Sequence, residues 1–519
     1  MKRKVLFFTV VFICCSILTL FGRPAAEAAE PKFGGTLRVA IIGEPPTIDG
    51  HWTTATIVSI ISHHYLEPLF TFNDKYEIVP MLAESYKIGE GGKVYTIKLR
   101  QHVPFHNGKE MTSADVFSSI SRWGKIATVG KRLFTQVESF KAVDKYTVEF
   151  RLKGPSGIVL PSLANVNQLP GIYPKEVVDE AGDGMVKQFI GTGPFKFVER
   201  MPDRFIKFSR FDKYAARKEP QTGFGGKKIA YVDEILFLPV TDVATRTAGV
   251  ESGDYHFADR IAPDSYKRLK ENPRLEPITV RNGEYVVGVF NKKMGLMTNK
   301  KLRQAALAAL DMDAILMGAF GQKEFYEPDN SVVALKESVW WTDVGKENYN
   351  QKNKEKAKQL LKEAGYKGET IRWICSQQYD FHYKSALVAK QQMEDVGFKV
   401  DLQVMDWAGL VQRRNDPTLY EVFSTSMIFY GDPTQALQLN CDWPGWTCIP
   451  RVETLMNKLA QETQFEKRLT IWKEIQKIYW DEVPVLHFGD YLLLRVKQKN
   501  VNGNKNLIEP IFWNVWIEK

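Results

Sequence analysis

Helix and strand patterns alternate regularly between residues 354 and 405, and this alternation restricts the possible folds more than any other feature. Two helical runs, 354–364 and 384–396, are each followed directly by a glycine, which adopts the left-handed conformation at a helix C-terminus at little cost. Apolar strand patterns follow at 370–375 and 398–405. This repeat predicts an α/β lobe with a partly parallel sheet.

The whole chain is too long to share one hydrophobic core. Without the N-terminal segment discussed below, about 490 residues remain, and this length suggests two or three domains. Residues 76–200 contain short strand patterns and turns, and Thr112 with Asp115 forms a capping-box sequence at the start of a helix. Further elements are expected toward the C-terminus: helical spacing over 299–320, helices at 451–463 and 465–480, a strand at 483–494, and an aromatic strand at 508–517.

These patterns predict a two-lobed α/β protein with a hinge. We expect lobe I to comprise residues 29–285 and 490–519, with an inserted subdomain at about 75–190, and lobe II to comprise residues 286–489. Two strands near 284–291 and 486–494 are expected to cross between the lobes.

The N-terminus predicts export. Lys2, Arg3 and Lys4 precede an apolar run from Val5 to Leu20, and Ala26-Glu27-Ala28 fits a small-x-small cleavage site, so residues 1–28 are expected to be a signal peptide. An uncleaved anchor is the alternative, but the run is short for a span of about 20 residues. We expect a periplasmic protein of a Gram-negative type.

Charge and cysteine usage narrow the class further. The formal net charge of +9 falls to about +6 without the signal, and no basic-aromatic motif of nucleic-acid type is found. After cleavage Cys375, Cys441 and Cys448 remain. In an oxidising compartment the near pair Cys441–Cys448 is the expected disulfide, and Cys375 is expected to be a buried thiol.

Residues 426–448 are unusually aromatic for a loop. The segment turns at Gly431-Asp432-Pro433, and its two cysteines flank two tryptophans. Such ring area either packs onto a core or contacts a ligand. We expect one wall of a ligand cleft here, formed by Phe429, Tyr430, Asp432, Trp443 and Trp446; the alternative is a disulfide-pinned loop that covers core.

A second candidate wall follows the first strand of the chain. Residues 34–42 have the pattern of a buried strand, and a helix is expected from about residue 55 to 66. Trp52, Thr53 and Thr54 lie at this junction and are predicted to face the ligand. The alternative is a helix cap with a core tryptophan.

The sequence carries none of the common catalytic motifs that would point to an enzyme. The sequence has no G-x-S-x-G elbow, no H-E-x-x-H and no phosphate-binding loop. His63 and His64 are adjacent, so on a helix they diverge and do not share one metal easily. We expect no catalytic residue, no metal site and no cofactor.

Several long segments resemble one known family. Leu82 to Val116, the run G-T-G-P-F-K-F-V, Val232 to Asp254, and Phe290 to Asp311 are similar to the signatures of family 5 extracellular solute-binding proteins. The resemblance extends in order over residues 31–519. It implies a type II-like periplasmic binding protein: a monomeric receptor of an ABC importer, which captures a peptide or other small organic solute and delivers it to membrane permease subunits.

The resemblance also suggests individual site residues. In peptide receptors of this family the tryptophan matching Trp407 lines the pocket. Independently of the resemblance, Trp373, Tyr379 and Phe381 come from the strand and loop at 370–381 and are expected beside it, and core packing is the alternative for each aromatic residue. Those receptors carry an aspartate three residues before the acid-Pro step, where it pairs with the ligand's ammonium; this chain has Phe429 there. A desolvated ammonium without its counter-charge binds poorly, so a modified peptide, an opine-like conjugate, an aromatic acid or another organic solute is expected. The alternative is that Asp432 replaces the missing acid if the loop shifts, although its place beside Pro433 suits turn capping better.

Three other functions stay open from the sequence. A receptor of the same fold for a metal chelate or haem is one. A secreted hydrolase is another, from a different class. A chaperone-like use of the exposed aromatic residues is the third.

Overall fold

The structure is a computed structural model that describes residues 30–377, 379–405, 407–429 and 431–518. The predicted signal peptide, residues 1–28, lies outside this described part. Within it, no helix has both the length and the apolar character required to cross a membrane.

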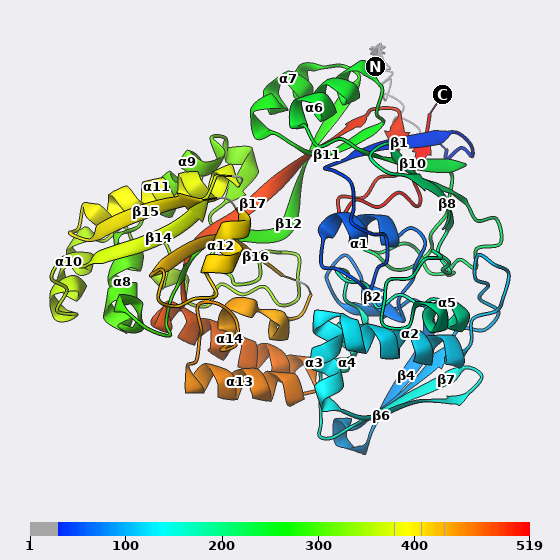
Figure 1. Cartoon of the computed structure of the whole chain (residues 1–519), viewed down its shortest axis with the longest axis horizontal. Coiled ribbons are helices and arrows are strands. Elements are labelled where there is room, and N and C mark those ends of the chain that lie inside the picture. The colour runs from blue at the N-terminus through cyan, green and yellow to red at the C-terminus, as the bar shows by residue number, and fades with distance from the viewer. Residues whose placement is uncertain (1–29, 378, 406, 430, 519) are drawn as a thin grey trace, which may run out of the picture.

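One large mixed sheet runs through both lobes (Figure 1). Its strand order is β15-β14-β16-β12-β17-β11-β1-β10-β9-β8, and β13 pairs with β17 off this path. The strands are β1 (Thr36–Ile41), β8 (Phe195–Met201), β9 (Phe205–Arg210), β10 (Glu234–Pro239), β11 (Phe257–Ile261), β12 (Leu275–Phe290), β13 (Tyr326–Glu327), β14 (Thr370–Ser376), β15 (Lys399–Met405), β16 (Val422–Ile428) and β17 (Val485–Gln498).

Lobe II contains the predicted helix-strand repeat. β14 pairs in parallel with both β15 and β16. The surrounding helices are α8 (Lys300–Ala309), α9 (Met312–Phe320), α10 (Lys354–Glu363), α11 (Asp380–Glu394), α12 (Trp407–Arg413), α13 (Pro450–Gln461) and α14 (Phe465–Glu482), with short 3-10 turns η3 (Leu296–Thr298), η4 (Lys323–Phe325), η5 (Lys346–Asn348), η6 (Pro433–Gln435) and η7 (Leu437–Leu439).

Lobe I is built around β1, which pairs in parallel with β10 and β11. Its other elements are α1 (Thr56–Ser62), β2 (Phe70–Phe72), β3 (Ile78–Pro80), α6 (Val243–Ser252), η2 (Pro263–Ser265), α7 (Tyr266–Glu271), β18 (Val501–Asn502) and β19 (Trp516–Ile517). Within the predicted subdomain range a separate sheet runs β4-β5-β7-β6. The elements there are β4 (Ala83–Gly89), η1 (Glu90–Gly92), β5 (Val94–Leu99), α2 (Ser113–Ile126), α3 (Thr128–Gln136), β6 (Val137–Asp144), β7 (Thr147–Leu152), α4 (Val159–Leu163) and α5 (Lys175–Ala181).

The long antiparallel strands β12 and β17 pass from one lobe to the other (Figure 1). The last part of β12 pairs with β16 of lobe II, whereas the last part of β17 pairs with β11 of lobe I. Their mutual register shifts between Arg281 and Tyr285, where Gly283 has a φ of 73°. A bulge at this point is a natural place for the two lobes to bend relative to each other. The expected boundaries at residues 285 and 490 lie beside the shift.

The lobes also meet at the base of the molecule, where α3 and α4 approach α13 (Figure 1). The amide of Gly157 donates a hydrogen bond to the carbonyl oxygen of Ala460 at 2.7 Å. Arg132 donates to the carbonyl oxygen of Thr434. These bonds join the inserted subdomain to lobe II at a point distant in sequence from the crossing strands.

Two expected elements are wrong in detail. The helical spacing over 299–320 belongs to two helices, α8 and α9, because Asp311 leaves the helix and caps the second one by accepting from the amide of Ala314. The strand expected at 508–517 is reduced to β19. The preceding residues are buried as irregular chain, held by side chains: Phe512 donates its amide to His64, and Asn514 accepts from the amide of Ile229.

Candidate ligand-binding site

The carboxyl ends of the parallel strands in the two lobes open onto a shared space. In open α/β sheets, ligands bind outside the carboxyl ends of the strands. The segments after β10 and β11 in lobe I, and after β14 in lobe II, line one cavity of about 700 Å³. The cavity therefore lies between the lobes, against the crossing strand β17.

Three aromatic rings form an apolar surface in this cavity. Phe320 at the end of α9 lies 5.6 Å from both Phe381 and Tyr491, measured between ring centroids. Phe381 and Tyr491 are 4.9 Å apart. The rings come from α9, α11 and β17, so the end of one helix, the start of another and a crossing strand meet here. The lining is completed by Val243, Arg246, Arg260, Ile261, Ala262, Pro263, Asp264, Gly318, Ala319, Gly321, Gln322, Tyr379, Asp380, Lys384, Leu492, Leu493 and Leu494.

Tyr379 is the predicted site residue that lines this cavity. It precedes α11, its side chain is 41% exposed, and its ring lies 6.1 Å from that of Phe381. Trp373, which was expected nearby, is instead a core residue: it is fully buried and donates from Nε1 to Ser424 at 2.9 Å. Trp373 is not among the residues that line the cavity.

The junction after β1 presents a partly exposed surface. Trp52 is 36% exposed. Thr53 accepts from the amide of Ala55 through Oγ1 at 3.2 Å, and Thr54 accepts a hydrogen bond from Asn167 through its backbone carbonyl. A ligand contact for these three residues stays a prediction.

The turn after β16 contacts lobe I directly. Phe429 is buried, with its ring 6.5 Å from that of Tyr76. Gly431 has a φ of 93°, and a Cβ atom there would lie 2.4 Å from the ring of Phe72. The glycine is thus required both by its conformation and by the close approach of lobe I.

Asp432 is held by the fold of lobe II. Its side chain is only 2% exposed and accepts two hydrogen bonds from Arg468, at 2.8 and 3.0 Å. It also caps η6 by accepting from the amide of Thr434 at 2.9 Å. The turn-capping role that its place beside Pro433 suggests is therefore seen, together with an ion pair that the sequence does not reveal.

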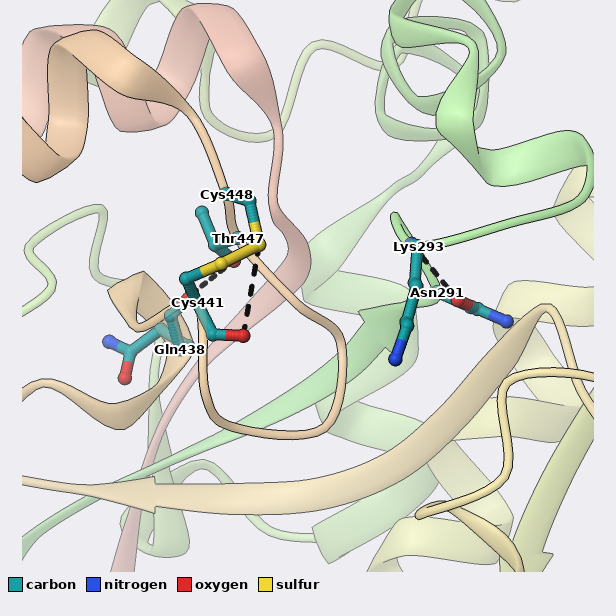
Figure 2. The surroundings of a disulfide bond; sticks show 6 residues. All are labelled: Asn291, Lys293, Gln438, Cys441, Thr447 and Cys448. Atoms are coloured by element: carbon teal, nitrogen blue, oxygen red, sulfur yellow. Dashed lines mark hydrogen bonds between the residues drawn. A yellow bond between two sulfur atoms is a disulfide. The ribbon is translucent and has the colours of Figure 1, made fainter.

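The disulfide between Cys441 and Cys448 closes the aromatic loop (Figure 2). Thr447 donates from Oγ1 to the carbonyl oxygen of Gln438 at 2.7 Å, which fixes the loop against the preceding turn. Lys293 lies across from the loop, with Nζ 5.2 Å from the ring centroid of Trp446.

The two tryptophans of this loop pack against β16 and the residues that precede it. The ring of Trp443 lies 5.6 Å from that of Phe423, and the ring of Trp446 lies 6.4 Å from that of Tyr420. Both tryptophans are half-buried on lobe II. Their ligand role is therefore still a prediction.

Two other predicted residues receive little or no structural description. Trp407 begins α12, directly beyond the end of β15, and its side chain is not described. Tyr430 lies outside the described residues.

Cys375 is a buried free thiol, and burial raises its pKa to about 12.

A second, smaller pocket of about 280 Å³ lies between the inserted subdomain and lobe II. Aromatic and apolar side chains dominate it, and the Asp432–Arg468 pair lies at its wall. Its lining includes Tyr76, Ile78, Tyr86, Ile88, Tyr95, Leu160, Pro161, Val339, Trp340 and Phe465.

Charged residues connect the crossing strands at the hinge. Arg281 of β12 donates to Asp490 of β17 at 2.8 Å and also pairs with Glu327 of β13. Asp490 is fully buried, and burial, reinforced by nearby Asp329, raises its pKa well above the usual range. Lys336 pairs with Glu327 from the other side.

The geometry offers little to a metal ion. Within the described part of the chain, Cys441, Cys448 and Glu453 bring potential ligand atoms within 4.8 Å of one another. Both sulfurs are bonded to each other, however, so thiolates are not available there.

Sequence patterns missed the cationic side of the cavity and two of its three clustered rings, Phe320 and Tyr491, whereas Phe381 was expected near the site. Arg260 has a φ of 50°, unusual for a residue other than glycine, and no sequence signal marks it. Phe320, Arg246 and Tyr491 appear in the sequence as ordinary helix and strand residues, and only the approach of the lobes brings them together.

A two-lobed α/β fold with a cavity at the strand ends defines a solute-binding protein of the periplasmic type. The profile of the bacterial extracellular solute-binding proteins, family 5 (middle region), matches residues 77–447. The chain belongs to this family. Its members are solute receptors of transport systems of the ABC-importer type, and the family is not one of enzymes.

Individual relatives agree over most of the chain. It is 28% identical to a probable peptide ABC transporter periplasmic-binding protein, y4tO, of Sinorhizobium fredii, with 96% of each chain covered. It is 30% identical to the oligopeptide-binding protein AppA of Bacillus subtilis, over 75% of this chain and 73% of AppA. Among solved structures, AgaA of A. tumefaciens R10 in complex with agropinic acid superposes with a TM-score of 0.75, at 23% identity, covering 93% of this chain and 99% of AgaA.

Proposed function

We propose that this receptor captures a peptide-like organic solute whose binding does not depend on a free amino terminus. The observation that carries the proposal is the cavity between the lobes, which combines an aromatic cluster with arginine side chains. The resemblance to peptide receptors of the family, which carry at the position of Phe429 an acid that pairs with an ammonium group, supports this choice of ligand. The relatives named above bind peptides or, in AgaA, agropinic acid, so the fold accommodates both classes of ligand.

Capture follows from the hinge. A ligand that touches both lobes only when they are closed favours the closed form by its difference in affinity for the two forms. The bulge beside Gly283 supplies the bend, and the hydrogen bond from Gly157 to Ala460 joins the two lobes at their other contact. The permease subunits of the importer then recognise the closed receptor, and the solute leaves unchanged because the receptor performs no chemical step.

The same proposal covers location and assembly. The protein acts as a monomer in the periplasm, after export directed by residues 1–28. The disulfide between Cys441 and Cys448 supports this location, because disulfides persist in oxidising compartments.

Calorimetric titration with matched peptides tests the proposal. A panel of tripeptides is made with free and with N-acetylated amino termini. We expect the acetylated forms to bind at least as tightly as the free forms, because a desolvated ammonium without a counter-charge costs several kcal/mol. Micromolar or tighter binding of free peptides, with loss of binding on acetylation, contradicts the proposal.

A further inference from the structure

The cavity between the lobes carries three cationic side chains on its wall. They are Arg246, Arg260 and Lys384, accompanied by Asp264 and Asp380. Lys384 pairs with Asp380 one helical turn away. Of the two arginines, both from lobe I, Arg260 is the more exposed to the cavity, and Arg246 lies beneath it.

The backbone aims Arg260 out of its strand. Its φ of 50° lies in the left-handed region, which costs free energy for any residue except glycine. The register between β11 and β17 shifts between Ala258 and Ile261, so Arg260 lies within an irregularity of the strand. Such irregularities redirect single side chains and are frequent beside binding sites.

The guanidinium group of Arg260 has acidic neighbours, but they are held more closely by other groups. Its nearest carboxylates are Glu284 at 3.7 Å and Asp259 at 4.0 Å. Asp259 accepts from Arg495 at 2.9 Å, and Glu284 accepts from the hydroxyl of Tyr491.

Among the described residues, the side chain of Arg260 makes no hydrogen bond, and it is 30% exposed. A guanidinium carries five N–H donors in a fixed plane. Its donors are thus available to a group inside the cavity.

Arg246 holds the peptide group of Arg260 in place. It donates to the carbonyl oxygen of Arg260 at 3.0 Å, and to those of Val240 and Thr241 at 2.6 and 2.9 Å. Arg246 is only 5% exposed, and its Nε has no partner among the described residues. It joins the carboxyl ends of β10 and β11 beneath the cavity and adds positive charge there, so Arg260 is positioned before a ligand arrives.

We propose that Arg260 anchors a carboxylate of the solute in the inter-lobe cavity, with Arg246 as its positioning residue. The planar guanidinium matches a carboxylate through two parallel hydrogen bonds, which a lysine does not reproduce. The aromatic rings of Phe320, Phe381 and Tyr491 then contact the apolar part of the same molecule. This inference rests on the proposed function and adds the charge of the ligand to it.

The test uses a panel of N-acetylated tripeptides, each made as the free acid and as the carboxamide. Wild-type protein is expected to bind at least one acid at least tenfold more tightly than its amide. Arg260→Ala and Arg260→Gln are expected to bind acid and amide equally. Arg260→Lys is expected to recover only part of the preference. Arg210→Ala is the matched control, because Arg210 has a similar exposure of 29% but lies on β9 outside this cavity.

The outcomes separate the two claims. An acid-to-amide affinity ratio that stays tenfold in Arg260→Ala and Arg260→Gln overturns the role of Arg260. Equal binding of acid and amide by wild-type protein overturns it as well. Either result leaves the proposed function standing. If only peptides with a free amino terminus bind, the proposed function fails, and the same acid-to-amide comparison on those peptides still judges Arg260. Binding of no acid at millimolar concentration contradicts both. Unchanged thermal unfolding of the Gln variant shows that the fold is intact.

Discussion

Asp432 shows how a residue with the features of a ligand contact serves the fold instead. It has the charge, the turn position and the aromatic neighbours expected of a binding residue, yet it is buried in a two-bond pair with Arg468. Arg468 lies 36 residues further along the chain, so no local pattern announces the pair.

Removing one partner of that pair leaves an uncompensated buried charge. We expect Asp432→Asn to lower the free energy of unfolding by about 3–5 kcal/mol, measured by urea denaturation. Glu90→Gln is the control, since it breaks a pair with Arg151 that is exposed to solvent. Equal stabilities of the two variants would show that the buried pair does not stabilise the fold.

His64 is a buried residue whose protonation state matters. Its Nε2 accepts from the amide of Phe512 at 3.0 Å, and its Nδ1 donates to the carbonyl oxygen of Ile60 at 2.9 Å, so both bonds together need the neutral ring. Burial, assisted by the charge of His63, lowers its pKa to about 3. The folded state therefore resists protonation, whereas the unfolded chain accepts the proton near the ordinary histidine pKa of 6.5.

The lowered pKa of His64 makes the stability of the fold depend on pH. Stability from this residue is complete above pH 6.5 and decreases as the pH falls toward 3, by about 1.4 kcal/mol per pH unit. We expect the stability difference between wild-type protein and His64→Gln to narrow below pH 6.5 and to approach that rate by about pH 5. Parallel stability curves for the two proteins in urea denaturation would argue against a depressed pKa.

Among the elements, the disulfide loop is one whose pairing the sequence predicted. Cys441 and Cys448 are seven residues apart, and the expected bond between them is present. Replacing both with alanine is expected to cost about 2–3 kcal/mol of stability, because the closed loop is short. Urea denaturation with and without reductant measures this, and reductant should not affect the variant. A variant as stable as oxidised wild-type protein would mean that the bond is strained or redundant.

Helices and strands with strong periodicity could be predicted from the sequence. The places where single side chains end a helix or hold irregular chain could not. The capping box at Thr112 and Asp115 opens α2 as expected, and the helix-strand repeat in lobe II is present. The split at Asp311 depends on one cap within an otherwise helical run. The segment near Phe512 has the apolar sequence pattern of a strand because its side chains are buried. Burial produces this pattern in irregular backbone as well.

Considered as a whole molecule, the protein brings together segments that the sequence keeps far apart. The two-lobed arrangement could be expected from the α/β repeat and the chain length. The cavity could not, since Arg260, Phe320, Phe381 and Tyr491 come from four elements and meet only when the lobes pack. Tyr379 follows a parallel strand and lines the cavity, as its place in the sequence suggested, and its contact with a ligand stays a prediction.

The proposed capture depends on two lobes that close around a solute and release it unchanged. Small-angle X-ray scattering, without ligand and then saturated with the tightest-binding acid of the tripeptide panel, measures this directly. A smaller radius of gyration in the saturated sample, together with recovery of the intact ligand, is the predicted result. An identical radius of gyration at saturation would contradict closure.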